Sequence, residues 1–144
     1  MDDGYVEASI RALSKGFLRS SDYTTLVQCN SLDDFKLCLE DTDYEKYIVT
    51  NDGAKLDSID LKRKMYQKLR DEIEYIMANA SEPLQGFLQQ MMHLYQIENV
   101  IAFISGVKNN QDPGITKKAL NPLGEFQGLK SVSQFAADEF VSLF

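Results

Sequence analysis

The fold is decided by residues 82–106, which read EPLQGFLQQMMHLYQIENVIAFISG. Apolar side chains recur in this stretch at spacings of three and four residues, which is the period of an α-helix. In its first half they lie on one face, at Leu84, Phe87, Leu88, Met91 and Tyr95. In its second half nearly every side is apolar, which indicates deep burial. The sequence therefore predicts a helix over residues 83–107.

Residues 58–79 predict a second helix of similar length. Asp57 or Ser58 can cap its start, because both side chains accept hydrogen bonds from the free N–H groups of a first turn. The apolar stripe of this helix consists of Ile59, Leu61, Met65, Leu69, Ile73, Ile76 and Met77. The charged side chains that fall largely off the stripe are Lys62, Arg63, Lys68, Arg70 and Glu74.

Only a short link separates these two helices. Ser81 can cap the second helix, and Pro83 fits its first turn, where a missing N–H does no harm. Helices joined so closely are expected to pack as an antiparallel hairpin, here residues 58–107, at the centre of the core. Ile101 is then a buried residue, and Ile101→Asp is expected to unfold the chain because a buried unpaired charge costs several kcal/mol.

Several helix starts are crowded into residues 20–44, which read SSDYTTLVQCNSLDDFKLCLEDTDY. Starts are predicted at Ser21 or Asp22, at Ser31, and at Thr42 or Asp43. Each start supplies acceptors for the free N–H groups of a helix, so the chain can change direction often. The sequence predicts one all-α domain over residues 1–144, with short helices in 4–48, the hairpin in 58–107 and further short helices in 113–144.

The composition is that of a soluble globular domain. The chain has 144 residues, of which 44% are hydrophobic and 26% charged, with a formal net charge of −7. This acidic balance disfavours nucleic acid and anionic lipid as partners, because both require a basic surface. The sequence shows no apolar run of about 20 residues and no signal peptide. The two cysteines are expected to be free thiols in a reducing compartment.

The residue types that carry chemistry are few and scattered. His93 is the single histidine, and with Cys29 and Cys38 alone it cannot complete a tetrahedral zinc set. The two cysteines lie on adjacent predicted helices and can approach one another. Two buried small apolar side chains are favoured over a redox pair. The sequence contains no G-x-S-x-G elbow, and its glycines never bunch into a phosphate-binding loop.

The remaining candidates are acidic pairs, which could in principle do acid and base work. They are Asp33-Asp34, Glu40-Asp41 and Asp71-Glu72, and all three are interpreted as solvated helix faces. Met91-Met92 is interpreted as core filler rather than an adaptable binding face. We therefore predict no catalytic residue, no cofactor and no metal, and a chain that is not an enzyme.

Four segments resemble subunit d of the eukaryotic vacuolar-type proton ATPases, a family that includes the archaeal-type "C" subunit. The first runs from DDGYVEASIRAL into the stretch of residues 20–44 quoted above. The others are EPLQGFL, YQIENVIAFISG and NPLGEF. They occur in the family's order and at close to its spacing over residues 3–126.

The resemblance implies an all-helical, funnel-shaped protein of three similar lobes around a cavity. It implies a place on the cytosolic face of vacuolar or other acidic-organelle membranes, on top of the proteolipid ring. The end of the central rotor stalk would enter the cavity, so that the protein joins stalk to ring and couples rotation to proton transport without catalysis. Membrane association would come only through the complex. The resemblance does not say which residues form the interfaces.

Family members continue far beyond Phe144, so the chain is expected to be the N-terminal part of a longer protein, roughly one lobe. A lobe without its neighbours exposes apolar surface, and weak self-association is expected through residues 129–144. The side chains expected to take part are Phe135, Phe140, Leu143 and Phe144.

Two alternatives remain on the residues alone. A free-standing helical adaptor that docks a partner helix has the same composition and periodicity. A small helical hydrolase would need a second histidine or a carboxylate site, and neither is visible.

Overall fold

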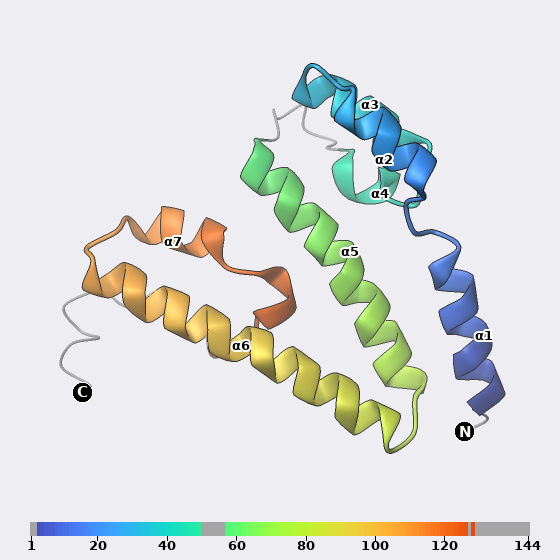
Figure 1. Ribbon diagram of the computed structural model, residues 1–144. Helices are drawn as coiled ribbons and strands as arrows, with labels where there is room; N and C mark the ends of the chain where they lie inside the picture. The colour runs from blue at the N-terminus through green and yellow to red at the C-terminus, as the bar shows by residue number, and fades with distance from the viewer. Residues whose placement is uncertain (1–2, 50–56, 127, 129–144) are drawn as a thin grey trace. The chain divides into compact units, whose positions relative to one another are not determined.

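The computed structural model describes residues 3–49, 57–126 and 128. In these residues it has seven α-helices, one short 3-10 helix and no β-strand, so the all-α prediction is confirmed (Figure 1). The α-helices are α1 (Asp3–Ser14), α2 (Ser20–Val27), α3 (Leu32–Glu40), α4 (Glu45–Ile48), α5 (Ser58–Asn79), α6 (Leu84–Lys108) and α7 (Pro113–Ala119). The 3-10 helix η1 spans Pro122–Gly124. No helix in these residues is both long enough and apolar enough to cross a bilayer.

The chain divides into two compact units, residues 1–86 and 87–144. The long helices α5 and α6 lie close to their predicted bounds of 58–79 and 83–107. Their antiparallel packing, and the single domain, stay predictions. Residues 127 and 129–144 lie outside the described residues. The end of the predicted short-helix region 113–144 and the four side chains expected to self-associate lie there as well.

The first unit is built around α5. Figure 1 shows α2, α3 and α4 gathered beside the first half of this helix, while α1 runs along its second half. Each of the four helices α2 to α5 contributes one buried side chain to a shared core, which consists of Leu26, Leu39, Ile48 and Leu61. Tyr5 and Tyr75 join α1 to α5 through a hydrogen bond of 2.7 Å between their hydroxyl oxygens.

Of the three helix starts predicted in residues 20–44, the one at Ser31 is confirmed. The start predicted at Thr42 or Asp43 was wrong, because the cap position of α4 is Tyr44. The Asp34 N–H donates to Oγ of Ser31 at 3.1 Å, and the Asp60 N–H donates to Oδ1 of Asp57 at 2.7 Å. At α2 the prediction was wrong by two residues or more, because the cap position is Arg19. Asp22 lies in the first turn instead, and its carboxylate accepts the Arg19 N–H at 2.6 Å.

The second unit is built around α6, and α7 and η1 run back along this helix (Figure 1). Phe103 of α6 packs with Leu120, Val107 and Phe126. Gly106 lets α7 approach closely, because a Cβ at this position would lie 2.7 Å from the Thr116 side chain. The buried face of α6 therefore meets the chain that follows it.

The opposite face of α6 corrects the expectation of deep burial. Leu94, Ile97 and Ile101 are 64%, 56% and 59% exposed, at helical spacings of three and four. The expectation that Ile101 is a core residue was therefore wrong, and the reason to expect that Ile101→Asp unfolds the chain is removed with it. A helix with apolar side chains on two opposite faces has the same sequence pattern as a helix that is buried on all sides.

We expect Leu39→Ala to lower the free energy of unfolding by about 2–5 kcal/mol, because Leu39 is fully buried and a cavity would remain. The matched control is Leu37→Ala on the same helix, where the side chain is 61% exposed. The control should change stability by less than about 0.5 kcal/mol. Urea unfolding followed by far-ultraviolet circular dichroism measures both, and equal losses would contradict this core.

Candidate functional site

The polar side chains of the first unit converge where α4 and its flanks meet α5. Lys68 lies at the centre, and its side chain is only 3% exposed. Its ammonium forms an ion pair with Glu72, one turn further along α5, and lies 4.7 Å from the ring centre of Tyr44. A buried ammonium is tolerated only with such partners, because its desolvation costs several kcal/mol. We call Tyr44, Lys68 and Glu72 the lysine cluster.

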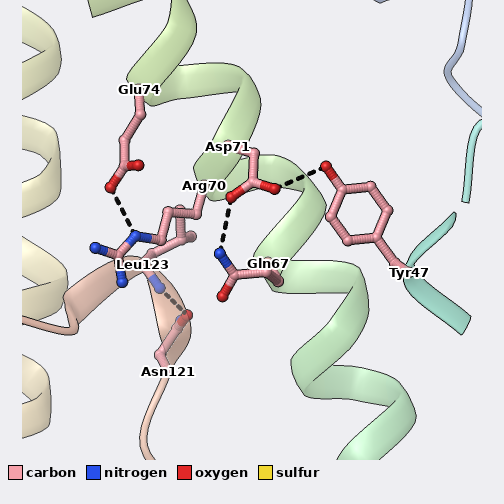
Figure 2. A network of polar contacts seen from close by, with 7 residues as sticks. All are labelled: Tyr47, Gln67, Arg70, Asp71, Glu74, Asn121 and Leu123. Atoms are coloured by element: carbon pink, nitrogen blue, oxygen red, sulfur yellow. Dashed lines mark hydrogen bonds and ion pairs between the residues drawn. The ribbon is translucent and has the colours of Figure 1, made fainter. Parts of the chain in front are cut away.

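A second group of contacts extends this cluster along α5. Figure 2 shows the Asp71 carboxylate held from two sides. The Tyr47 hydroxyl donates to Oδ2 at 2.9 Å, and Nε2 of Gln67 donates to Oδ1 at 2.8 Å. The Lys46 ammonium lies 4.7 Å from the ring centre of Tyr47. The bond from Tyr47 to Asp71 ties α4 to α5 beside the apolar core, and the other two contacts hold its partners in place.

Both tyrosines are kept as neutral phenols. Burial raises the pKa of Tyr44, and the Glu72 carboxylate raises it further. Burial also raises the pKa of Tyr47, where the hydrogen bond to Asp71 adds to the increase and Lys46 opposes it. A protonated Tyr47 can donate to Asp71 at neutral pH, and neither phenol is prepared to act as a base.

Two hollows flank the lysine cluster. One of about 610 Å³ lies between the chain around α4 and the second half of α5, and Leu13, Tyr47 and Tyr75 contribute to its wall. The other, of about 330 Å³, is lined by Phe17, Tyr44 and the middle of α5. Lys68 and Glu72 border both hollows. The arrangement is a surface of mixed polar and apolar side chains.

The first two acidic pairs lie where the sequence indicates. Glu40 and Asp41 are exposed, and Asp33 forms a surface ion pair with Lys36. The Asp34 N–H is used in capping its helix at Ser31. None of these carboxylates is enclosed by the chain, so none of them lies in a site suited to acid–base catalysis.

For the third acidic pair, Asp71-Glu72, the interpretation as a solvated helix face was wrong in part. Asp71 is exposed but accepts two side-chain hydrogen bonds, and the Glu72 side chain is only 15% exposed and pairs with Lys68. The burial of Lys68 was not predicted because a lysine is normally exposed. Lys68 nevertheless follows Leu61 by seven residues and so lies on the same face of the helix. From the sequence, Lys68 could be interpreted only as a charged residue outside the apolar stripe of this helix.

The other chemical candidates are not brought together with this cluster. His93 is half-buried on α6, in the second unit. Met92 is buried, as its interpretation as core filler requires. Among the described residues, no three His, Cys, Asp or Glu side chains are grouped so as to hold a metal ion. Cys29 and Cys38 are free thiols whose sulfur atoms lie 3.5 Å apart.

In the second unit the motifs YQIENVIAFISG and NPLGEF meet through one pair of hydrogen bonds. Asn99 is 2% exposed. Its Nδ2 donates to the Asn121 carbonyl oxygen at 2.8 Å, and its Oδ1 accepts the Asn121 N–H at 2.8 Å. Oδ1 of Asn121 in turn accepts the Leu123 N–H at 3.0 Å (Figure 2). Sequence analysis missed this role, although Asn99 is a polar amide within a largely apolar half-helix.

Gly124 completes the same joint. A Cβ at this position would lie 2.2 Å from the Tyr95 carbonyl oxygen, so only glycine allows this approach to α6. Leu123 beside it is fully buried. The residues of NPLG thus serve in turn as a cap, a helix start, a core side chain and a close contact.

We expect Lys68→Met to lower the free energy of unfolding by about 3 kcal/mol, because it leaves the Glu72 carboxylate without its partner. The double variant Lys68→Met/Glu72→Leu should be more stable than the single variant, since no charge is then stranded. Arg11→Met is the control, because the Arg11–Glu7 pair is exposed and worth at most about 1 kcal/mol. A double variant no more stable than Lys68→Met would contradict the cluster.

We expect Asn99→Ala to lower the free energy of unfolding by about 1–3 kcal/mol for each backbone group of Asn121 that loses its partner. Asn109→Ala makes the same chemical change at an exposed position and should be close to neutral. Hydrogen exchange of the Asn121 amide gives an independent measurement. Unchanged protection in the Asn99→Ala chain would show that this bond does not hold the joint.

Comparison with known proteins gives a consistent family. The family model of the ATP synthase (C/AC39) subunit matches residues 6–144. A probable V-type proton ATPase subunit d of Oryza sativa is 34% identical over 131 residues, which cover 91% of this chain and 37% of the relative. The V-type proton ATPase subunit d of Saccharomyces cerevisiae is 30% identical over the whole chain and 41% of its own length.

A third relative is more distant. It belongs to the A-type ATP synthase of Pyrococcus abyssi and is 27% identical over 109 residues, which cover 76% of this chain and 29% of the relative. The chain thus spans about two fifths or less of the length of these relatives. Because the family model covers nearly all of its residues, the chain belongs to the ATP synthase (C/AC39) subunit family.

Proposed function

We propose that the chain serves as a non-catalytic part of a V-type proton-pumping ATPase. In this role it joins the central rotor stalk to the proteolipid ring, so that rotation driven by ATP becomes proton transport. The observation that carries the proposal is the family match over residues 6–144, together with relatives named V-type proton ATPase subunit d from Oryza sativa, Dictyostelium discoideum and Saccharomyces cerevisiae.

The local structure supports a mechanical role. A part that transmits torque must resist deformation, and in both units hydrogen bonds join segments far apart in the chain. They include Tyr5 to Tyr75, Tyr47 to Asp71, and Asn99 to Asn121. Among the residues of the family-like motifs, Tyr5, Asn99 and Asn121 take part in such bonds.

The proposal also covers place and partners. The chain would lie on the cytosolic face of vacuolar or other acidic-organelle membranes and would be held there by the complex. Its net charge of −7 supports contacts with basic protein surfaces rather than with anionic lipid or nucleic acid. It would form roughly one lobe of a three-lobed funnel whose other lobes complete the socket for the stalk.

The test is a chimera in yeast. Residues 1–144 replace the aligned N-terminal part of the S. cerevisiae subunit d, in cells that lack their own copy. ATP hydrolysis and ATP-driven proton uptake are then measured in the same vacuolar vesicles. We expect the chimera to assemble with the complex and to restore both activities within a few-fold of the yeast protein.

A chimera with Leu39→Asp serves as the unfolded control, because it buries a charge in the core of the first unit. The chimera with Leu37→Asp, at an exposed position, should remain active. A folded chimera that is stable in cells but neither assembles nor restores proton uptake would contradict the proposal and favour a free-standing adaptor.

A further inference from the structure

The two cysteines of the chain form a pair that the proposed function does not use. Their sulfur atoms lie 3.5 Å apart, although nine positions separate the residues in sequence. Cys29 lies in the short connection between α2 and α3, and Cys38 lies on α3. Residues 1–144 contain no other cysteine, so within this stretch each thiol has one candidate partner.

The geometry favours bond formation between them. A disulfide has a sulfur–sulfur bond of about 2.05 Å, so the two atoms would need to approach by about 1.5 Å. Cys29 is outside any helix, but its backbone N–H donates to the Leu26 carbonyl oxygen at the end of α2 at 3.3 Å, so a shift of Cys29 has to stretch this one turn bond. Cys38 is fixed by its helix and packs against the core cluster that contains Leu39. One sulfur atom is held and the other can move toward it.

Both thiols are reachable by small molecules. Each residue is half-buried, so neither sulfur is sealed in the core. Burial raises the pKa of Cys29, and the neighbouring Cys38 thiol and Asp34 carboxylate raise it further. The thiolate is the reactive form, so a raised pKa slows attack by Cys29 at neutral pH.

We propose that Cys29 and Cys38 form a reversible thiol–disulfide site that is oxidised by small disulfides of the glutathione class. One protein thiolate attacks a sulfur of the oxidised disulfide, whose sulfur–sulfur bond breaks and releases one small thiol. The second protein thiolate then attacks the protein sulfur of this mixed disulfide and releases a second small thiol. The two protein thiols lose two protons and two electrons, and the small disulfide gains them.

The product would pin the connection between α2 and α3 to the body of α3. It would close a loop that contains Ser31 and the first turn of that helix, next to the core cluster of the first unit. Closing a loop restricts the unfolded chain more than the folded one, so the oxidised protein should be the more stable form. The site would thus couple the redox state of the surroundings to the rigidity of the first unit.

The test uses the full chain, equilibrated in mixtures of reduced and oxidised glutathione and then alkylated with N-ethylmaleimide. Trypsin cuts after Lys36, between the two cysteines, and leaves peptides 20–36 and 37–46. We expect the two peptides to remain joined after oxidation, in a monomer whose mass has fallen by about 2 Da and which takes up no alkylating agent. Reduction should separate them.

Two controls decide whether the fold builds the site. Cys29→Ser and Cys38→Ser chains should stop at a single glutathione adduct or stay reduced, with unchanged circular dichroism. In urea, at the same glutathione ratio, the equilibrium constant for closing the disulfide should fall at least about tenfold, since the unfolded chain no longer holds the sulfurs together.

Three results would each overturn the proposal. They are glutathione adducts on the folded parent chain without closure, disulfide-linked dimers as the main product, and equal closure in folded and urea-unfolded chains. The measurement does not depend on assembly with an ATPase, so it can fail or succeed independently of the function proposed above.

Discussion

The apolar contact among Leu26, Leu39, Ile48 and Leu61 is the constraint on which the first unit depends. Helices α2, α3 and α4 have 8, 9 and 4 residues, whereas isolated helices shorter than about 12–15 residues are marginal in water. They exist because each places one side chain in a core that α5 completes. Caps such as Ser31 direct the chain, and burial supplies the stability. The lysine cluster then adds polar contacts that favour one packing of α4 on α5.

The second unit solves a different problem. Its long helix α6 needs a cover for one face, and the cover is a short return segment with little regular structure. Such a segment has many backbone groups that must find partners. Asn99 provides two of them from inside the helix, and Asn121 provides another for the turn that follows. Gly106 and Gly124 allow the close approach that makes these bonds short enough.

The sequence predicted what depends on local chemistry. Helix period, caps at Ser31 and Asp57, and the ends of α5 and α6 are properties of neighbouring residues, and the structure has them. It did not predict what depends on distant partners. Burial of Lys68 requires Tyr44, and the role of Asn99 requires a turn 22 residues away. The period of α6 could not reveal which of its two apolar faces is covered.

The same distinction explains why the proposed function rests on the family match rather than on a reactive site. A reactive site is recognised by residue types that chemistry demands, and a mechanical part has no such signature. Its sequence motifs mark the contacts between segments, where an asparagine or a glycine is required by packing or hydrogen bonding rather than by a reaction. In NPLGEF the first four residues are each explained by their place against α6. A motif of this kind identifies a relative with the same joint, and the work of that joint must be measured in the assembled machine.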